Sequence, residues 1–424
     1  MDPTSPTAEA RPRLAVAYGE GSVDAMAIAD AARGWCDLLW LVDGRNQSVV
    51  AVRPLLERFG AVIDALGTSP AQTADALAPH SPDGLVTFFD SGMEELAVAA
   101  ERLGLAFHTP EVARRLQDKL LQRDALRAAG LPTPQVVDLP AGADRASVER
   151  LASAIGFPAV LKPRRASGSW HTFPVAGPSA LGALWDELAA GGPEARVLEE
   201  YLSDGPPMPQ GFEADYVSVE TIAVAGRSTH LALTGRFPLA PPFRETGFFI
   251  PATLGSDLRA EVLALAAQAL AALGFENGCA HTEVKLTAEG PRIIEVNGRI
   301  GGGVPDMLRL ASGVDMMTLA MKAALGVAPA IAEVPATSAV GYRFFFQPPV
   351  SARRTIAVDG LDRLKLVPGV ESITMRRPLG SGFDARDGTR SHVFAVVGWA
   401  EDYAGMLAVE AFLRSEIKAT YEHA

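Results

Sequence analysis

Residues 281–300, with the sequence HTEVKLTAEGPRIIEVNGRI, alternate polar and apolar side chains on both sides of a short turn-like segment. Successive side chains of a β-strand point to opposite faces, so this alternation predicts a β-hairpin with one polar and one apolar face. With Glu289 at the centre of the turn, two polar pairs face each other across the strands: Glu283 with Glu295, and His281 with Asn297. The opposite face is then expected to carry four apolar residues, namely Val284, Leu286, Ile294 and Val296.

Two carboxylates that face each other across a hairpin repel, so the pair needs a cation beside it. The oxygen ligands of Glu283, Glu295 and Asn297 favour Mg²⁺ or Mn²⁺ over zinc, and Mg²⁺ commonly shares such sites with substrate phosphates. Arg299, one step further on the same face, can hold a phosphoryl oxygen with two hydrogen bonds. The alternative is a solvated hairpin on which Lys285 and Arg299 form salt bridges with the glutamates, but the pattern favours the metal site.

The first hundred residues alternate short apolar runs with amphipathic ones. The runs at 14–19, 37–44 and 84–90 are typical of strands, and those at 22–33 and 93–104 are typical of helices. Strands and helices that alternate in this way predict a parallel sheet covered on both faces. After the first strand, GEGS lacks the third glycine of a dinucleotide-binding loop, which favours an ordinary turn over a phosphate-binding one.

A single helix is expected over 110–129, because Gly130 follows it and Pro132 and Pro134 prevent its continuation. A helix at 147–156 with strands at 158–163 and 196–202 then indicates a small mixed lobe. The tail contains three strand-like runs and a closing helix at 402–417. The chain is therefore expected to mix α/β and α+β architecture in five segments: a disordered lead-in (1–13), an N-terminal α/β domain (14–112), a linker helix with the small lobe (113–203), a large lobe with the hairpin (204–334) and a C-terminal α+β subdomain (335–424).

Composition excludes several kinds of partner. The chain has 424 residues and a formal net charge of −12, so it repels phosphate backbones and anionic lipid surfaces, which argues against nucleic-acid or membrane partners. No apolar run is long enough to span a bilayer, and the first residues lack the apolar core of a secretion signal. Cys36 and Cys279 suit neither a disulfide framework nor a zinc spacing, so we expect a cytoplasmic location.

The small lobe carries weaker signals. Lys162 ends an apolar strand and precedes a loop with Ser167, Gly168 and Ser169, whose small side chains would let backbone amides approach phosphate oxygens. An ordinary strand lysine beside an ordinary loop is the alternative, and Lys119, in a helical DK pair, is more commonly a solvated residue. Where the strand at 196–202 passes into a linker, Glu199, Glu200 and the backbone near Leu202 could bind an adenine, or Glu199 and Glu200 could form an exposed acidic pair.

Four blocks of sequence resemble the ATP-grasp superfamily in their order and spacing: DKLLQRDALRAAGLPTP, GFPAVLKPRRASGS, VLEEYL and HTEVKLTAEGPRIIEVNGRIGGG. The resemblance runs from about Leu14 to the end of the chain and implies an ATP-grasp fold, in which two α+β lobes enclose ATP. It implies that Lys119 and Lys162 contact the phosphates and that Arg299 stabilises an acyl phosphate or a tetrahedral intermediate. It also implies a ligand set for adenine (Glu199, Glu200, Leu202) and one for two Mg²⁺ (or Mn²⁺) ions (Glu283, Glu295, Asn297).

Finer features are similar to the branch that contains L-amino-acid ligases and carnosine-synthase-like enzymes. PPFRETGFFIPATL, with Glu245, resembles the substrate-side segment of that branch, and EVNGRIGGG resembles its glycine-rich continuation. Glu200 departs from a common lysine, and GFF stands where a GH pair is common. Gly301, Gly302 and Gly303 would let the backbone approach the acceptor amine or the acyl phosphate, with a flexible turn as the alternative. Glu220 lies where relatives place an acidic group, or is a plain strand glutamate.

These features predict an ATP-dependent ligase that activates a carboxylate as an acyl phosphate and transfers it to an amine. The predicted substrates are small molecules, amino acids or amino-acid-like compounds. His281 and Glu220 are candidate general bases, and the 166–171 loop is a candidate lid. Two alternatives stay open: a ligase or carboxylase that uses carboxyphosphate, as in biotin or purine metabolism, and a non-catalytic nucleotide-binding regulator. Homodimers are common in the resembled family.

Overall fold

The computed structural model describes residues 10–19, 21, 23–205, 208 and 210–423. Residues 1–9 of the predicted lead-in lie outside this set, as do Glu20 and Ser22 of the GEGS segment. The fold class expected from the sequence is confirmed: a parallel sheet is combined with antiparallel sheets and helices.

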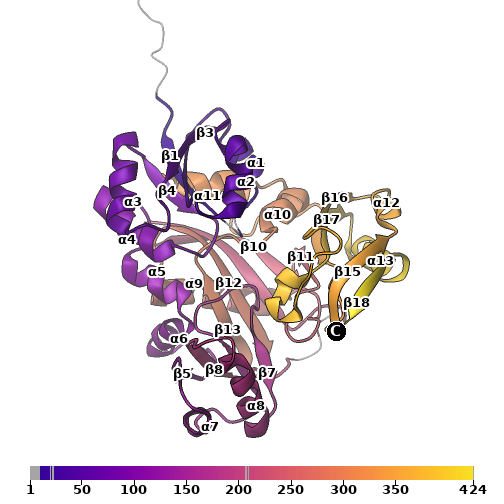
Figure 1. The fold of residues 1–424 in the computed structure, drawn as a ribbon. Helices are drawn as coiled ribbons and strands as arrows, with labels where there is room; N and C mark the ends of the chain where they lie inside the picture. Colours follow the sequence, from indigo (N-terminus) through magenta and orange to yellow (C-terminus); the bar gives the residue numbers. More distant parts are fainter. Residues whose placement is uncertain (1–9, 20, 22, 206–207, 209, 424) are drawn as a thin grey trace, which may run out of the picture.

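The N-terminal part forms a four-stranded parallel sheet in the order β3-β2-β1-β4 (Figure 1). Helices cover both faces, because the strands are apolar on both sides. The sequence pattern identified two of the helices and three of the strands, and it missed α2, β3 and α3. The elements are β1 (Arg13–Tyr18), α1 (Ala25–Ala32), β2 (Asp37–Val42), α2 (Gln47–Leu56), β3 (Gly60–Asp64), α3 (Pro70–Leu77), η1 (Ala78–His80), β4 (Gly84–Thr87) and α4 (Met93–Leu103).

The single helix predicted over 110–129 is wrong, because the chain forms two helices, α5 (Pro110–Gln117) and α6 (Lys119–Ala128). Asp118 separates them with extended backbone angles, φ −115° and ψ 111°. Its carboxylate accepts hydrogen bonds from the amides of Leu120 and Leu121 and thereby caps α6. Lys119 is consequently the first residue of a new helix rather than a residue in mid-helix.

A small antiparallel sheet follows, in the order β5-β8-β6-β7, with α7 and α8 packed on it. Figure 1 shows this lobe as a separate unit below the central sheet. Its elements are β5 (Val136–Leu139), α7 (Arg145–Ala152), β6 (Ala159–Pro163), β7 (Phe173–Val175), α8 (Pro178–Ala189) and β8 (Arg196–Glu200).

The centre of the molecule is an eight-stranded antiparallel sheet in the order β13-β12-β9-β10-β11-β14-β17-β16. The tail therefore supplies three strands to the same sheet as the hairpin. The strands are β9 (Tyr216–Val224), β10 (Arg227–Arg236), β11 (Gly247–Ile250), β12 (Gly278–Thr287), β13 (Gly290–Asn297), β14 (Val340–Phe345), β16 (Val370–Met375) and β17 (Phe394–Ala400).

Helices α9 (Ser256–Leu273) and α13 (Tyr403–Glu416) pack through the two apolar clusters on one face of this sheet. Helices α10 (Val304–Ser312) and α11 (Met316–Ala323) pack on the other face. The expectation of three tail strands and a closing helix was incomplete. The tail also contains β15 (Ala352–Asp359), α12 (Leu361–Leu364) and η2 (Ala385–Ser391), and α13 is followed by β18 (Lys418–His423), which pairs with β15.

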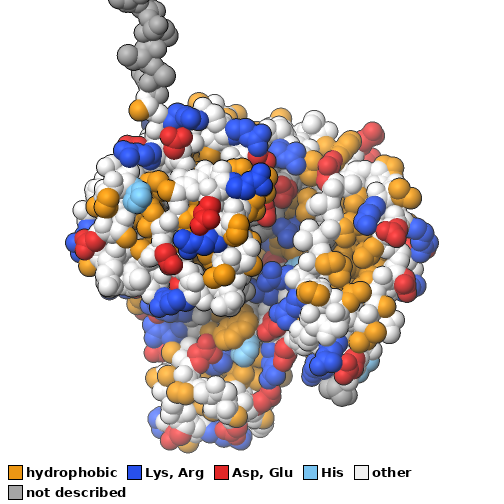
Figure 2. Space-filling model, turned by 45° about the horizontal axis from the view of Figure 1, so that its top comes forward, with side chains coloured by type: hydrophobic (Ala, Val, Ile, Leu, Met, Phe, Trp, Pro, Cys, Tyr) orange, Lys and Arg blue, Asp and Glu red, His pale blue; other side chains and the backbone are white. Residues whose placement is uncertain are grey.

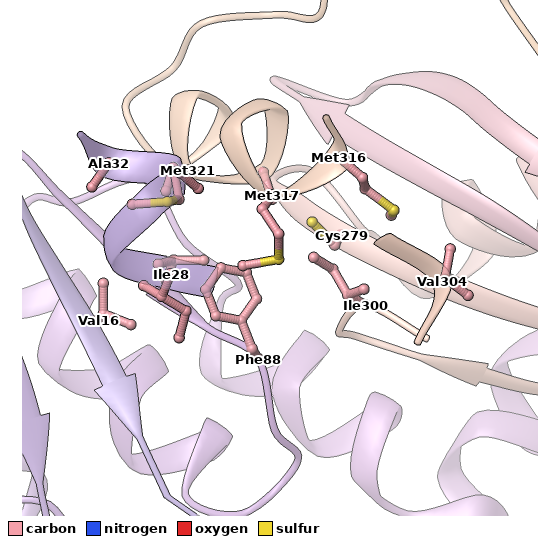
Figure 3. Close-up of a cluster of buried hydrophobic side chains, with 14 of the residues drawn as sticks. Val16, Ile28, Ala32, Phe88, Cys279, Ile300, Val304, Met316, Met317 and Met321 are labelled. Atoms are coloured by element: carbon pink, nitrogen blue, oxygen red, sulfur yellow. The ribbon is translucent and has the colours of Figure 1, made fainter. Parts of the chain in front are cut away.

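A continuous apolar cluster joins the N-terminal sheet to the central sheet (Figure 3). Ile28 and Phe88 from the N-terminal part meet Met317 and Met321 of α11, while Cys279 contributes from the central sheet. Both cysteines are buried and free. Because these side chains pack against one another, the N-terminal part is held against α11 and the central sheet. No helix in the described part of the chain is long and apolar enough to cross a membrane.

Replacement of Met321 by alanine tests this joint. Met321 has no exposed surface, so Met321→Ala should lower the free energy of unfolding by about 2–5 kcal/mol through lost burial and a residual cavity. Met375→Ala is the matched control, because that side chain is 37% exposed at a sheet edge and its loss should cost about 0.5 kcal/mol or less. Urea unfolding followed by circular dichroism measures both, and equal losses would contradict a tightly packed joint.

Candidate active site

The hairpin of β12 and β13 has the predicted register at its functional end: His281 pairs with Asn297 and Glu283 with Glu295. The register shifts by one residue between Glu283 and Val284, so the turn closes with Thr287 opposite Gly290. The extra residue is in β13, and for this reason Ile293, not Ile294, lies in the apolar layer with no exposed surface. The prediction of an apolar role for Ile294 is therefore wrong, whereas the carboxylate pair is placed as expected.

Polar side chains form a row across one face of the central sheet. The strand registers bring Glu283 of β12 beside Ser218 of β9, and Ser218 beside Thr234 of β10. Two residues further along the strands, His281 lies beside Glu220. Neighbouring residues in antiparallel register point to the same face, so these groups share one surface. The space-filling view shows charged side chains gathered in a hollow between the lobes (Figure 2).

Cations from α6 and β6 pair with a carboxylate of the hairpin and with one of β8. Lys119 Nζ lies 2.9 Å from Glu295 Oε1 and also donates to the carbonyl oxygen of Ala166. Lys162 Nζ lies 2.6 Å from Glu199 Oε2, and Arg123 Nη2 lies 3.0 Å from the other oxygen of Glu199. Burial lowers the pKa of Lys162 and so do its cationic neighbours Arg123 and Lys119, although Glu199 and Glu295 oppose this effect. A polyanion placed among these groups would offset this mutual repulsion.

Glu199 is held ionised inside this group of cations. Burial raises the pKa of Glu199, but Arg123 and Lys162 outweigh burial and lower the pKa below its ordinary value. Glu200, the next residue, points elsewhere: its two oxygens accept hydrogen bonds from Arg292 at 2.8 Å and 2.8 Å. Leu202 is buried, with 9% of its surface exposed. The structure thus brings Glu199 to Lys162 and Arg123, and leaves Glu200 paired with Arg292 of the hairpin.

Arg299 is fixed by a carboxylate that sequence reasoning missed. Asp90 Oδ2 accepts from Arg299 Nε at 3.2 Å, and Arg299 Nη1 donates to the carbonyl of Ile300. Burial raises the pKa of Asp90, but Arg299, a hydrogen bond from Ser167 and the charge of Lys119 outweigh it and lower the pKa. Asp90 follows β4 at the carboxyl end of a parallel strand, where ligand-binding residues commonly lie. This position after a predicted strand could have identified Asp90 as a candidate site residue from the sequence.

His281 connects a buried carboxylate to the metal candidate. Its Nδ1 lies 2.9 Å from both oxygens of Glu220, and its Nε2 lies 3.3 Å from Glu283 Oε1. Burial opposes both charges, but Glu220 raises the pKa of His281 to about 9, and His281 in turn lowers the pKa of Glu283 to about 2. Glu220 has no exposed surface and also accepts from Ser218 and Thr234, so it acts on the cleft through His281.

The substrate-side segment is linked to the small lobe through one threonine. Glu245 Oε1 pairs with Arg236 Nη1 at 2.7 Å, while Glu245 Oε2 accepts from the hydroxyl of Thr389 at 3.1 Å. The amide of Thr389 donates to the carbonyl of Gly168 at 3.0 Å, and the amide of His171 donates to Arg386 at 2.8 Å. The loop with Ser167, Gly168 and Ser169 therefore rests on η2, close to Glu245.

Gly301, Gly302 and Gly303 carry the chain over the polar row toward α10. A Cβ atom at Gly301 would lie 2.6 Å from Nδ1 of His281, and one at Gly303 would lie 2.1 Å from Nη1 of Arg343. Gly303 also has a φ of +78°, which larger residues rarely adopt, whereas a Cβ at Gly302 would meet nothing within 4 Å. The glycines thus allow close passage over His281 and Arg343.

The donor set of the hairpin fits a divalent cation that shares its coordination with phosphate. Mg²⁺ commonly takes one or two protein carboxylates and completes its shell with phosphate and water oxygens. Glu283, Glu295 and the buried amide of Asn297 supply such donors, and both carboxylates now have a cationic side chain beside them. A cluster of three or more His, Cys, Asp or Glu side chains suited to a metal does not occur in the described part of the chain.

A second hollow, of about 920 Å³, lies apart from this row. It opens between the hairpin turn and α9 and includes Glu200, Arg292 and Gln268 but none of the three candidate metal ligands. The candidate active site is therefore defined by charged residues that converge, and not by the size of a cavity. These residues are Lys119, Lys162, Glu283, Glu295 and Arg299.

The chain has the ATP-grasp fold that the four sequence blocks predicted. The whole fold is similar to the crystal structure of L-amino acid ligase from Bacillus licheniformis, with a TM-score of 0.78 and 20% identity over 97% of this chain and 99% of that one. N5-carboxyaminoimidazole ribonucleotide synthetase from Thermotoga maritima is also similar in fold, with a TM-score of 0.69 and 14% identity over 97% of this chain and 100% of that one.

The sequence is also similar to that of several proteins over part of their length. Carnosine synthase 1 of Gallus gallus is 29% identical over 274 residues, which cover 60% of this chain and 28% of that protein. Alanine–anticapsin ligase of Bacillus subtilis strain 168 is 27% identical over 263 residues, which cover 56% of this chain and 52% of that protein. An uncharacterised Sinorhizobium fredii protein, y4rH, is 30% identical over 285 residues, covering 63% and 53%. The chain thus spans about half the length of these relatives or less, and no family model matches it.

Replacement of adjacent glutamates tests the buried ion cluster. Glu199→Gln should lower the free energy of unfolding by about 3–5 kcal/mol, because Lys162 and Arg123 would lose their buried counterion. Glu200→Gln, the matched control, removes a half-buried pair with Arg292 and should cost about 1 kcal/mol or less.

The same pair predicts a pH dependence. The pKa of Glu199 is lower in the folded chain, so its contribution to stability is present above the unfolded pKa of about 4.3 and is lost as the pH falls toward the folded value. The free energy of unfolding is measured in urea between about pH 3 and about pH 7. It should fall less on acidification in Glu199→Gln than in the parent chain. Parallel pH profiles would contradict the assignment.

Proposed function

We propose that the protein is an ATP-dependent ligase that forms an amide or peptide bond between a carboxylate and an amine and releases ADP and phosphate. The observation that carries the proposal is the facing pair Glu283 and Glu295, with Lys119 and Arg299 directed at the same place. Opposed carboxylates surrounded by lysine and arginine suit a metal and a polyphosphate together. The names of the relatives support an amino acid, or a compound like one, as substrate.

Lys119 and Lys162 are proposed to bind the phosphates of ATP, because both are buried cations at the junction of the small lobe and the hairpin. The adenine is proposed to lie where β8 ends, near Glu199 and Leu202. The side chains of Glu199 and Glu200 are engaged in ion pairs, so the contacts to the base would come from the backbone there. The loop with Ser167, Gly168 and Ser169 is proposed to cover the phosphates.

Glu283, Glu295 and Asn297 are proposed to hold Mg²⁺, or Mn²⁺, in two positions. When bound, the metal neutralises charge on the β and γ phosphates during transfer to the carboxylate. Lys119, now paired with Glu295, would move its contact to phosphate oxygen. This exchange keeps both Lys119 and Glu295 paired with an opposite charge.

Activation makes the acyl carbon reactive because phosphate is a far better leaving group than oxide. Arg299, oriented by Asp90, is proposed to hold the phosphoryl group and the oxyanion that forms when the amine attacks. The amine has to lose a proton in this step, and we assign that proton to the neutral form of His281, which Glu220 orients. Because Glu220 raises the pKa of His281 to about 9, this form prevails only above that pH, and transfer to the amine is expected to speed up toward it. The loop resting on η2 excludes water, which would otherwise hydrolyse the acyl phosphate.

The proposal extends to the size of the substrates and to the location of the protein. Substrates are proposed to be small molecules, in keeping with the charged side chains that gather in a hollow between the lobes (Figure 2). A cytoplasmic location is part of the proposal, because both cysteines are free and ATP is the proposed substrate.

Glu295→Gln tests the ligase proposal. The change keeps the shape of the side chain and removes the charge needed beside the metal and phosphates, so ADP release should fall by at least about a hundredfold. Glu289→Gln, at the exposed turn of the same hairpin, is the matched control and should keep parent activity. The assay combines ATP, Mg²⁺ and a pool of amino acids with coupled detection of ADP and mass spectrometry of new amides.

Other outcomes identify the alternatives. ADP release that depends strictly on bicarbonate, with no amide mass, would indicate a carboxyphosphate-using enzyme. Nucleotide binding without turnover, equal in the parent chain and in Glu295→Gln, would indicate a nucleotide-binding regulator.

A further inference from the structure

Arg343 lies at the end of the polar row described above. It is on β14, beside Phe248 of β11, which is in turn beside Arg236 of β10, and all three point to the same face of the sheet. Its guanidinium carbon lies 5.1 Å from the ring centre of Phe345, and that of Arg236 lies 4.0 Å from the ring of Phe248. The row that begins at the metal candidates therefore ends in a guanidinium set among aromatic rings.

Arg343 differs from the other arginines of the site in its partners. Arg123 pairs with Glu199, Arg236 with Glu245, and Arg299 with Asp90. Among the described residues, Arg343 makes no ion pair and no side-chain hydrogen bond, and its Nε is buried without a partner. Withdrawing a cation from water without an anion is unfavourable, so this arrangement suits a site whose anion arrives with a ligand.

The glycine segment leaves room for such an anion. A Cβ atom at Gly303 would lie 2.1 Å from Nη1 of Arg343, so a larger residue there would push the guanidinium aside. Gly303 also precedes the first turn of α10, the end at which a helix dipole favours negative charge. The guanidinium and the start of this helix thus border the same space, next to the open position of Gly302.

Other charges lie near Arg343, and they are of both signs: Arg377 is itself paired with Asp387 at 3.4 Å. Arg376 and Arg377 lie close enough, with Arg343, to lower the pKa of His392, whose burial is the largest cause of a pKa of about 4. The acidic groups that act on Arg343 are Asp306 and Glu245, and Glu245 is already paired with Arg236.

We propose that Arg343 binds a substrate carboxylate that is not the one activated by ATP. The inference rests on the ligase function proposed above and narrows its substrates to those with a second anionic group. The group can be the free carboxylate of an amino acid that supplies the amine, or a second carboxylate on the acid that is activated. Both present two oxygens to the planar fork of the guanidinium.

A binding experiment tests Arg343 without requiring turnover. Thermal unfolding is measured with Mg²⁺, a non-hydrolysable ATP analogue and, one at a time, L-amino acids, β-alanine, succinate and glutarate, each beside its carboxamide. In the parent chain, carboxylates should raise the unfolding temperature more than their amides do, and Arg343→Met should remove this difference. An equal response of the parent chain to acids and amides, or an unchanged difference in Arg343→Met, would overturn the proposal.

Matched variants separate binding from folding. Arg354→Met removes an exposed arginine, paired with Glu422 at 3.6 Å, and should behave as the parent chain does. Arg343→Lys keeps the charge without the fork and should retain part of the preference, and Gly303→Ala should weaken it by displacing the guanidinium. If Arg343→Met does not fold, these two variants decide: a preference undiminished in both would refute the role of Arg343.

Turnover then identifies the source of the carboxylate. Two pairs of substrates are compared: the amine substrate with its carboxamide, and the acid substrate with its half-amide. In the pair that carries the bound group, Arg343→Met should lower kcat/KM of the carboxylate form about tenfold to a hundredfold, with little effect on the amide form. The substrate that shows this effect carries the group. Absence of ADP release with every pair would refute the ligase function. The thermal-unfolding experiment would then still decide whether Arg343 binds a carboxylate. ADP release with an unchanged preference would refute Arg343 alone.

Discussion

The repulsion between Glu283 and Glu295 is the constraint on which the rest of the site depends. Their strands place them directly opposite each other, and the chain balances them with cations from different segments: Lys119 beside Glu295, and His281 beside Glu283. Each cation is in turn held by its own surroundings, since Glu220 orients His281 and the new start of α6 orients Lys119. Helix α6 and the central sheet are thereby tied together through charge as well as through packing.

The hairpin could be predicted from sequence because strand side chains alternate with a period of two, and pairing at one point fixes its neighbours. Even there, the register shifts by one residue after Glu283, so Ile293 and not Ile294 packs in the apolar layer. The sequence did not predict this shift, because an extra residue in one strand cannot be recognised from the alternation of polar and apolar side chains. The break at Asp118 was missed for a related reason. Helical periodicity continues across α5 and α6, and an aspartate in mid-pattern resembles any polar surface residue until its carboxylate is seen to cap the following amides.

The partners of the functional residues were the least predictable part. Arg299 was found by its spacing from Asn297, but its counterion Asp90 is 209 residues away, in the segment that follows β4 of another sheet. Arg123 shares a helix face with Lys119 and lies in one of the recognised blocks, yet its buried contact with Glu199 depends on how the small lobe folds back. Contacts of this kind follow from the packing of whole elements, which the apolar cluster of Figure 3 determines, and a single sequence contains no record of that packing.

Thr389 shows how this packing joins the two halves of the proposed reaction. Its amide holds the carbonyl of Gly168 in the loop proposed to cover the phosphates, and its hydroxyl holds Glu245 on the substrate side. A movement of that loop away from η2 breaks the first contact, and a substrate that recruits Glu245 competes with the second. Because one side chain and its own amide make both contacts, the cover over the phosphates and the substrate segment are not independent. A ligase that forms a reactive acyl phosphate needs this dependence, since the cover has to stay closed until the amine is in place.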